Sequence, residues 1–400
     1  MDISDTMNKR ETKDTNTLRN VYALGVVSFF TDMSTEMVFS LLPAFLLGLP
    51  GSSRAILGLI EGSAEALSYV LRAISGIFSD RFWKRKQFVL IGYALSNFVK
   101  PFFAIAKTPL DVLVIRISDR VGKGIRTSPR DALLCESVSK KQRGTAFGLH
   151  RTLDQTGAIV GPLIASAVMI LLSFTIRQVF WLSLIPGSIA LLIILFIVKE
   201  RRTESVSEFH LLDVVKSVLK GDFSVLLLVV AVFSLGAFNF SFILLNASEA
   251  GVSTSFLPLV YAAINIATVI VAIPAGALSD RIGKEKVMVL GYSVFLLSAL
   301  LILLPLNGIF TLLIAVVYGV YLGIVETVQR AMVPDYVEEH YRGAAYGLYY
   351  LVVGSAFFIS NSVVGLFWEY FGSFAASTYS AIFAIMGILA LIAFIHIRKK

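Results

Sequence analysis

Long apolar runs separated by short polar segments follow one another along the whole chain. Each run has roughly the 20 residues that an α-helix needs to cross a bilayer. The pattern therefore predicts an all-α integral membrane protein with twelve transmembrane helices. The expected spans, with ends good to about two to four residues, are 21–48, 54–79, 88–107, 109–135, 145–172, 177–198, 223–246, 254–278, 287–305, 309–334, 344–370 and 375–397.

Basic residues gather at both chain ends and in every second connection between the runs. Arg85 and Lys86 follow the second span, for example, and Lys140 and Lys141 follow the fourth. Because cytoplasmic connections carry the excess of Lys and Arg, both termini are expected in the cytoplasm. The interpretation is a multi-pass protein of the plasma membrane, in contact with membrane lipid.

The composition excludes several other classes of protein. Of the 400 residues, 56% are hydrophobic and only 16% are charged, which is unlike the balance of a soluble domain. The formal net charge of +8 follows membrane topology, so no nucleic-acid partner is expected. A single cysteine, Cys135, excludes a disulfide within the chain, and the four histidines have no metal-ligand spacing. Neither a metal nor a cofactor is expected.

Two sequence motifs occur once in each half of the chain. GIFSDRFWKRK at 76–86 returns as GALSDRIGKEK at 276–286, and RGTAFGL at 143–149 returns as RGAAYGL at 342–348. Two unrelated matches at nearly the same displacement indicate an internal duplication. Such repeats predict two six-helix bundles, related by a pseudo-two-fold axis along the membrane normal.

One long polar connection separates the two halves. The expected organisation is a cytoplasmic N-terminal segment, a first six-helix bundle, a cytoplasmic linker and a second six-helix bundle, at residues 1–20, 21–198, 199–222 and 223–397 respectively. In the linker, FHLLDVVKSVLK places apolar residues at helical spacing with lysines between them. This pattern is typical of a short helix on the membrane surface, and a plain solvated linker is the alternative.

The repeated loop motif resembles the signature loop of the major facilitator superfamily, Gly-x-Leu-x-Asp-Arg-x-Gly-Arg-Lys. The first copy has Trp83 where the family prefers glycine. The matching residues at the core of the motif are Gly76, Asp80 and Arg81 in the first copy and Gly276, Asp280 and Arg281 in the second. The resemblance implies the major facilitator fold for the whole chain.

The fifth span carries a second resemblance, to the Gly-x-x-x-Gly-Pro pattern of proton-coupled exporters of the drug/proton antiporter type. Gly157, Gly161 and Pro162 fit this pattern, whereas the closing Gly-Gly of the family is Ala165-Ser166 here. Small residues at steps of four let helices approach closely and slide, and proline bends a helix. These three residues are therefore expected to give the span its flexibility.

The resemblance also implies a gate on the cytoplasmic side. Asp80 would face the start of span eleven near Gly343, and Asp280 would face the start of span five near Gly144. A carboxylate that faces a helix N-terminus gains about 0.3–1 kcal/mol at an exposed site. Such contacts would hold the inner gate shut while the protein opens outward.

Ionisable residues lie inside the expected spans, most of them in the first half. One such charge costs about 2.5–3.5 kcal/mol at the bilayer centre on insertion scales, so several together need partners or water. On the fourth span, Arg116, Arg120 and Lys123 share one helical face. The candidates for proton coupling or substrate binding are Asp32, Glu36, Glu65, Arg116, Asp119, Arg120, Lys123 and Asp154.

Three roles fit these residues. A carboxyl group that gains and loses an arginine partner can load and unload a proton, and the expected pairs are Asp32 or Glu36 with Arg116 or Arg120. A further pair is Asp154 with Arg151 or Lys123. Alternatively, the cationic face of span four binds an anionic substrate through charge-assisted hydrogen bonds. As a third interpretation, the charges form permanent ion pairs that never titrate.

The sequence thus predicts a secondary active transporter that works by alternating access. Its expected partners are a small-molecule substrate and protons, its expected activity is proton-coupled efflux of a small organic solute, and it is expected to act as a monomer. The alternative activity is uptake or exchange of an organic anion. An enzyme is not expected, because the chain has no nucleophile–base set and no metal cluster.

Overall fold

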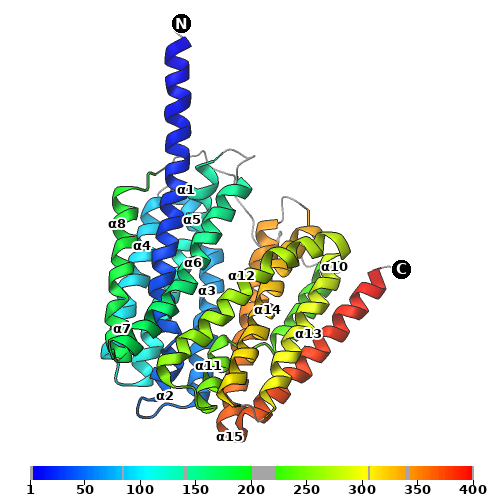
Figure 1. Cartoon of the computed structure of the whole chain (residues 1–400). Coiled ribbons are helices and arrows are strands. Elements are labelled where there is room, and N and C mark those ends of the chain that lie inside the picture. The colour runs from blue at the N-terminus through cyan, green and yellow to red at the C-terminus, as the bar shows by residue number, and fades with distance from the viewer. Residues whose placement is uncertain are drawn as a thin grey trace.

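The computed structural model describes residues 3–82, 85–138, 143–200, 221–304, 307–338 and 342–398. Within these ranges the regular structure is helical throughout. Figure 1 shows two groups of helices side by side, one built from the first half of the chain and one from the second. Residues 201–220, where the sequence predicts a surface helix, lie outside the described residues.

The first bundle contains the helices up to residue 196. Thr108 and Thr175 cap the N-termini of two of these helices with capping boxes. In each, the threonine hydroxyl accepts a hydrogen bond from the backbone N–H of the third helical residue, and the side chain of that residue accepts one from the threonine backbone N–H. Pro101 lies where an α-helix gives way to a 3₁₀ turn, because its ring cannot continue the α-helical hydrogen bonding. The helices are α1 Ile3–Phe39, α2 Leu42–Leu47, α3 Arg54–Phe82, α4 Arg85–Val99, η1 Lys100–Ile105, α5 Pro109–Glu136, α6 Arg143–Leu171, α7 Ile176–Leu182 and α8 Leu184–Phe196.

The second bundle contains the remaining helices. Gly283 joins two of them with a φ of +97°, and Gly372 turns the long last helix with a φ of +80°. Only glycine adopts such angles readily. The helices are α10 Asp222–Ser234, α11 Phe240–Glu249, η3 Thr254–Phe256, α12 Leu257–Ile282, α13 Lys284–Ile302, α14 Gly308–Met332, η4 Val333–Asp335 and α15 Arg342–Arg398.

These helices account for the twelve expected spans. In the described residues, 8 helical runs are long and apolar enough to cross a membrane. One of them, α15, makes two passes on either side of Gly372. The charged helices α3 and α5 and the interrupted pair α10–α11 supply the other three passes.

The chain ends identify one face of the molecule, which we call the terminal face. At this face Asn20 of α1 is hydrogen-bonded to Ser137 and to Lys199, while Arg398 of α15 pairs with Asp222 and Glu285. The opposite face, which we call the far face, carries the connections at 40–53 and 250–256. The two bundles meet toward the far face and diverge toward the terminal face (Figure 1).

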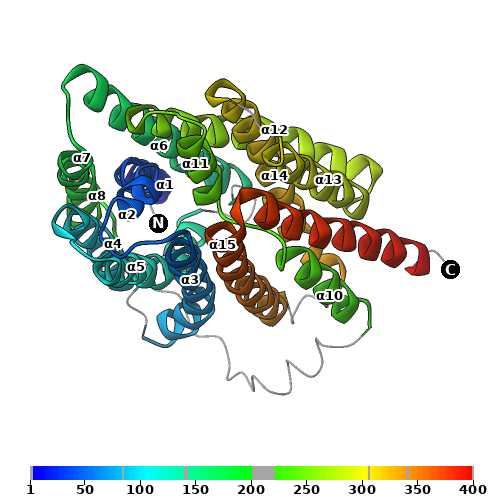
Figure 2. The same ribbon diagram turned by 90° about the horizontal axis from the view of Figure 1, so that it is seen from below.

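Two helix pairs make the interface between the bundles. Seen from below, α3 lies beside α15, and α6 lies beside α12 (Figure 2). On α3, an added Cβ at Gly58 would lie 2.1 Å from the backbone oxygen of Asn361. A glycine is therefore required there for α3 and α15 to approach so closely.

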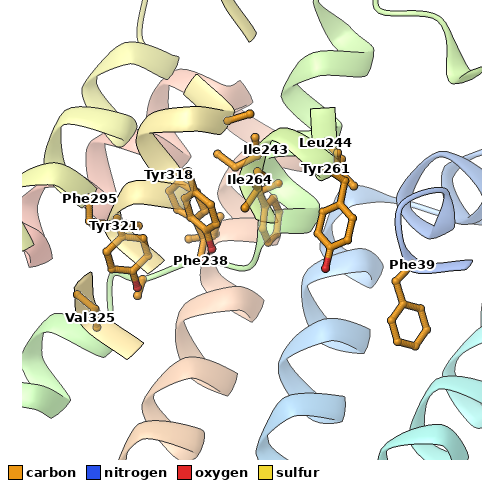
Figure 3. Close-up of a cluster of buried hydrophobic side chains, with 14 of the residues drawn as sticks. Phe39, Phe238, Ile243, Leu244, Tyr261, Ile264, Phe295, Tyr318, Tyr321 and Val325 are labelled. Atoms are coloured by element: carbon orange, nitrogen blue, oxygen red, sulfur yellow. Dashed lines mark hydrogen bonds between the residues drawn. The ribbon is translucent and has the colours of Figure 1, made fainter. Parts of the chain in front are cut away.

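Aromatic side chains fill the core of the second bundle (Figure 3). The Phe238 and Tyr318 rings stack with centroids 5.8 Å apart, and Phe295 lies 5.1 Å from Phe238. The Tyr318 hydroxyl donates to the backbone oxygen of Phe238 at 2.7 Å. Aromatic pairs of this kind contribute about 0.5–1.5 kcal/mol beyond their area burial, so this bundle is held mainly by apolar packing.

Candidate transport site

Glycines on α6 bring α1 and α6 into backbone contact. An added Cβ would lie 2.2 Å from the Phe29 backbone oxygen at Gly157, and 2.5 Å from the Met33 backbone oxygen at Gly161. Both distances are too short for any side chain. The close approach places Asp32 of α1 beside Asp154 of α6, one turn from Gly157.

The carboxyl groups of Asp32 and Asp154 lie next to each other. Two neighbouring carboxylates repel each other when both are ionised, and a hydrogen bond between them forms only when one of the two groups carries a proton. Arg151 Nη1 lies 3.1 Å from the Asp154 carboxylate, and Lys123 is within electrostatic reach of Asp32. The Asp154 side chain is 16% exposed. The pair can therefore hold one proton between two carboxyl groups beside two cations.

Glu36 lies one turn further along α1 and contacts the second bundle. Its carboxyl group lies near the Tyr261 hydroxyl of α12. Asn265, one turn further along α12, donates from Nδ2 to the Ala158 backbone oxygen of α6 at 3.1 Å. The Glu36 Oε2 atom is buried without a hydrogen-bond partner among the described residues. That oxygen is available to a proton or a ligand.

Glu61 of α3 and Arg116 and Asp119 of α5 form a buried group of charged side chains, which we call the dry knot. Arg116 Nη2 lies 2.6 Å from Glu61 Oε2, and the two side chains are 0% and 1% exposed. The Arg116 guanidinium covers the Phe39 ring at 3.7 Å and lies 4.0 Å from Asp119. Because both charges are removed from water, the pair is stable only while both partners are present.

Arg120 joins this knot to a more accessible carboxylate. It lies 3.6 Å from Asp119 and 3.4 Å from Glu65, which is partly exposed. Asp119 also accepts a short hydrogen bond from Ser96 of α4. Glu65 is thus the member of the network that solvent can reach.

Lys100 is completely buried at the junction of α4 and η1. Its ammonium donates to Thr35 Oγ1 at 2.8 Å and to Asn97 Oδ1 at 2.9 Å. Neutral oxygens therefore make its closest contacts, while Asp119, Asp32 and other charges act on it from a greater distance.

The structure pairs the charges differently from the sequence-based expectation. Asp32 lies next to Asp154 and Glu36 lies near Tyr261, whereas both were expected beside Arg116 or Arg120. Arg116 and Arg120 instead face carboxylates of α3. The rotation of each helix decides these pairings, and close contacts such as Gly92 of α4 against α5 set that rotation. The expected pair of Asp154 and Arg151 is present.

Three site residues were missed by sequence reasoning. Tyr261 and Asn265 are single polar residues on an apolar helix, a pattern that more often indicates packing than a site. Ser96 has an equally weak signal. Their contacts depend on which helices are neighbours, and that information comes from the fold.

Only part of the expected gate can be described. The side chains of Gly76, Asp80 and Arg81, and the expected partners Gly144 and Gly343, lie outside the described residues. In the second copy, Asp280 and Arg281 are exposed near the end of α12. Gly276 has only Thr327 nearby, 3.6 Å from an added Cβ. The gate therefore stays a prediction.

Ion pairs join the bundles at the far face. Arg54 Nε lies 2.7 Å from Glu249 of α11, and the Arg54 backbone N–H donates to Glu369 of α15 at 2.7 Å. Trp368 Nε1 donates to Glu249 at 3.0 Å. Nearer the terminal face, Arg151 Nη2 and Glu326 are 3.6 Å apart and are 52% and 42% exposed. The far-face contacts are hydrogen-bonded more tightly than the Arg151–Glu326 contact.

No group of three or more His, Cys, Asp or Glu side chains in the described part of the chain could hold a metal ion. The carboxyl groups and cations that are present can take part in proton transfer and charge pairing. Both rely on side chains of the first bundle and on one tyrosine of the second.

Comparison with known proteins identifies the family. The Major Facilitator Superfamily profile matches residues 24–237 and 224–399. An uncharacterized MFS-type transporter of Methanocaldococcus jannaschii is 32% identical over 369 residues, covering 91% of this chain and 92% of that protein. Multidrug resistance protein MdtG of Proteus mirabilis is 27% identical over 295 residues, covering 70% of this chain and 72% of that protein.

Solved structures show the same fold. The nucleoside transporter NupG superposes with a TM-score of 0.76 at 16% identity, covering 95% of this chain and 99% of the other. The peptide transporter POT superposes with a TM-score of 0.78 at 13% identity, covering 95% of this chain and 94% of the other. The expectations of an all-helical multi-pass membrane protein, and of a transporter rather than an enzyme, are confirmed. The chain belongs to the major facilitator superfamily of membrane transporters.

Proposed function

We propose that this transporter exports a small organic solute in exchange for protons, by alternating access of its two bundles. The observation that carries the proposal is the close approach of α1 and α6 at Gly157 and Gly161, which places the Asp32 carboxyl group next to that of Asp154. Two adjacent carboxyl groups can share one proton, and a proton held at one stage and released at another couples its own movement to transport. The similarity to MdtG, a multidrug resistance protein, supports the direction of export.

Arg151 links the proton site to the movement of the bundles. It lies between Asp154 of its own helix and Glu326 of α14. When the bundles rock, the Arg151–Glu326 distance changes, and with it the field that Arg151 exerts on Asp154. Protonation and conformation then bias one another, as two ligands of a two-state protein do.

We place the terminal face in the cytoplasm of the cell and the protein in the plasma membrane, because the basic connections lie on that side. In this orientation the Arg54 ion pairs close the outer end of the interface. The solute approaches from the cytoplasm past Arg151 and Glu326, which are both exposed. One chain supplies both bundles, so a monomer suffices.

The candidate residues then divide into two groups. Arg116 and Asp119 belong to the dry knot and act as a permanent brace between α3, α4 and α5. The other candidates are only partly buried or reach partly buried groups, and they contact protons or the solute: Asp32, Glu36, Glu65, Arg120, Lys123 and Asp154.

Uptake or exchange of an organic anion is less well supported. That activity requires cations of α5 that are available to the substrate. Arg116 and Arg120 already face Glu61, Glu65 and Asp119, so three carboxylates balance the two guanidinium groups.

Flux in proteoliposomes tests the proposal. Vesicles carrying the purified protein would be given a pH gradient, and the movement of cationic ethidium and of anionic carboxyfluorescein would be followed by fluorescence. Uphill movement that requires the gradient, and that disappears in Asp32→Asn, is expected. Purely downhill movement that ignores the gradient would reject proton coupling, and gradient-driven uptake of the anion alone would favour the second candidate.

A further inference from the structure

We infer that Asn265 of α12 replaces a hydrogen-bond donor that Pro162 removes from α6, and that the resulting bond holds the two bundles together at the far face. The bond runs from Asn265 Nδ2 to the Ala158 backbone oxygen at 3.1 Å. Asn265 belongs to the second bundle and Ala158 to the first, so we call it the cross-bundle bond. The inference rests on the proposed alternation of the bundles, since it gives this bond a role in that movement.

Pro162 explains why the Ala158 oxygen can accept from another helix. Pro162 lies inside α6, and proline has no backbone N–H. In an α-helix the N–H of each residue bonds to the carbonyl oxygen four residues earlier, which for residue 162 is that of Ala158. Ala158 is 6% exposed, and an unsatisfied carbonyl is costly in a membrane unless a neighbouring helix supplies a donor. Asn265 supplies that donor.

The Ala158 oxygen is fixed relative to the first bundle. Its neighbours Gly157 and Gly161 bring α6 against the backbone of α1. An added Cβ would lie 2.2 Å from the Phe29 oxygen at the first glycine and 2.5 Å from the Met33 oxygen at the second. Contacts this close leave α6 little freedom to turn or slide on α1. The Ala158 oxygen therefore moves with the first bundle.

Asn265 is fixed relative to the second bundle. The oxygen of the adjacent Ile264 would lie 2.3 Å from a Cβ added to Gly319 of α14. The Thr268 hydroxyl donates to the Gly319 backbone oxygen at 3.1 Å. Because α12 is packed so closely on α14, Asn265 moves with the second bundle. The length of the cross-bundle bond therefore depends directly on the separation of the two bundles.

The cross-bundle bond lies where the closed part of the interface between α6 and α12 ends (Figure 2). Nearer the far face, the Ser166 hydroxyl of α6 donates to the Ser255 backbone oxygen at 2.6 Å. Ala158 lies two turns, or about 12 Å, closer to the terminal face along the same helix. On the terminal side of Ala158, Thr152 and Thr156 of α6 are exposed. Separation of the bundles at the far face therefore breaks both bonds.

The free energy of closure follows from what replaces the bond in the open state. When the far face opens, water reaches the Ala158 oxygen and the Asn265 amide, so each exchanges its partner for water. The net contribution of one intramolecular hydrogen bond corresponds to about two- to tenfold in an equilibrium constant. The cross-bundle bond should therefore raise the ratio of closed to open protein at the far face by that factor.

Spin-label distances test the inference without any substrate and at a single pH. Lys107 and Ser253 are exposed at the far face on different bundles. Labels on Lys107→Cys and Ser253→Cys, in a Cys135→Ala background in nanodiscs, would report the ratio of long to short distances. Asn265→Leu keeps the approximate size of the side chain but donates no hydrogen bond. It should raise the ratio of long to short distances about two- to tenfold.

Replacement of the proline makes the result specific to the freed carbonyl. Pro162→Ala restores an N–H that competes with Asn265 for the Ala158 oxygen, so this variant should also raise the ratio. Addition of Asn265→Leu to Pro162→Ala should then change the ratio by less than about twofold, because the two substitutions act on one bond.

Pro274 supplies the matched control. It also lies inside a helix, but Ile270, four residues before it, is 65% exposed. Pro274→Ala should therefore leave the ratio of distances unchanged, and Asn265→Leu should keep its full effect in that background.

The outcomes separate this inference from the proposed function. Equal ratios in the wild type and Asn265→Leu overturn the inference, as does a full effect of Asn265→Leu in the Pro162→Ala background. If Asn265→Leu does not fold, equal ratios in Pro162→Ala and Pro274→Ala overturn it. Flux that is not coupled to protons, with the expected ratios of distances, overturns the proposed function and leaves the cross-bundle bond in place.

Discussion

Replacement of Glu61 by leucine should destabilise the protein far more than loss of an exposed ion pair. Arg116 is completely buried, and Glu61 lies 2.6 Å from it, whereas Asp119 is 4.0 Å away. Two of the Arg116 nitrogens, Nε and Nη1, have no hydrogen-bond partner among the described residues. Removal of one partner from a buried pair leaves a charge out of water and costs about 3–5 kcal/mol.

The double variant Glu61→Leu/Arg116→Met separates this cost from the net contribution of the intact pair to the free energy of unfolding. Replacement of both partners by apolar groups of similar volume is often neutral or even stabilising. The double variant should therefore recover most of the stability that Glu61→Leu loses. The assay is the free energy of unfolding of purified protein in detergent, measured with denaturant.

An exposed ion pair supplies the matched control. Arg54 and Glu249 are 2.7 Å apart but only partly buried, so Arg54→Gln should cost about 0–1 kcal/mol. If Glu61→Leu cost no more than Arg54→Gln, the knot would not be a permanent brace. A Glu61→Leu protein of normal stability that had lost transport would move Glu61 and Arg116 into the transport site and refute the reasoning.

Three other changes have defined outcomes. Gly157→Ala places a Cβ 2.2 Å from a backbone oxygen and should lower the free energy of unfolding by about 1–3 kcal/mol. Gly148→Ala, where an added Cβ has nothing within 4 Å, should be nearly neutral. Equal effects of the two substitutions would contradict the close contact between α1 and α6. Lys100→Met leaves the oxygens of Thr35 and Asn97 without their donor and should lower the free energy of unfolding, measured with denaturant, by about 1–3 kcal/mol. Unchanged stability would show that water replaces the amine. Asp280→Asn is exposed and should change stability by less than about 0.5 kcal/mol while it slows flux; normal flux would exclude Asp280 from a gate.

Hydropathy and duplication were enough to predict the architecture. Each of the twelve passes is an apolar run or a run broken by a few charges, and the repeated motifs at 76–86 and 276–286 identify the two halves. Helix ends were harder to predict. Residues 3–39 form one helix in the structure, so the helix begins well before the apolar run that starts at residue 21.

The charges themselves were visible in the sequence, but most of their partners were not. A charged residue in an apolar run is evident from composition, and Asp154 with Arg151 follows from spacing on one helix. Contacts between helices, such as Arg116 with Glu61, depend on helix rotation and on how near two backbones come. Gly92, which lets α4 pack on α5, shows that this information is distributed over residues with no chemistry of their own.

Proton movement driven by the solute alone tests the central claim most directly. Proteoliposomes would contain pyranine and a compound found in the flux screen, with equal pH on both sides. Outward movement of the compound should acidify the lumen in the wild type, and Asp32→Asn or Asp154→Asn should abolish the signal. Efflux of the compound without any change in lumen pH would contradict the account.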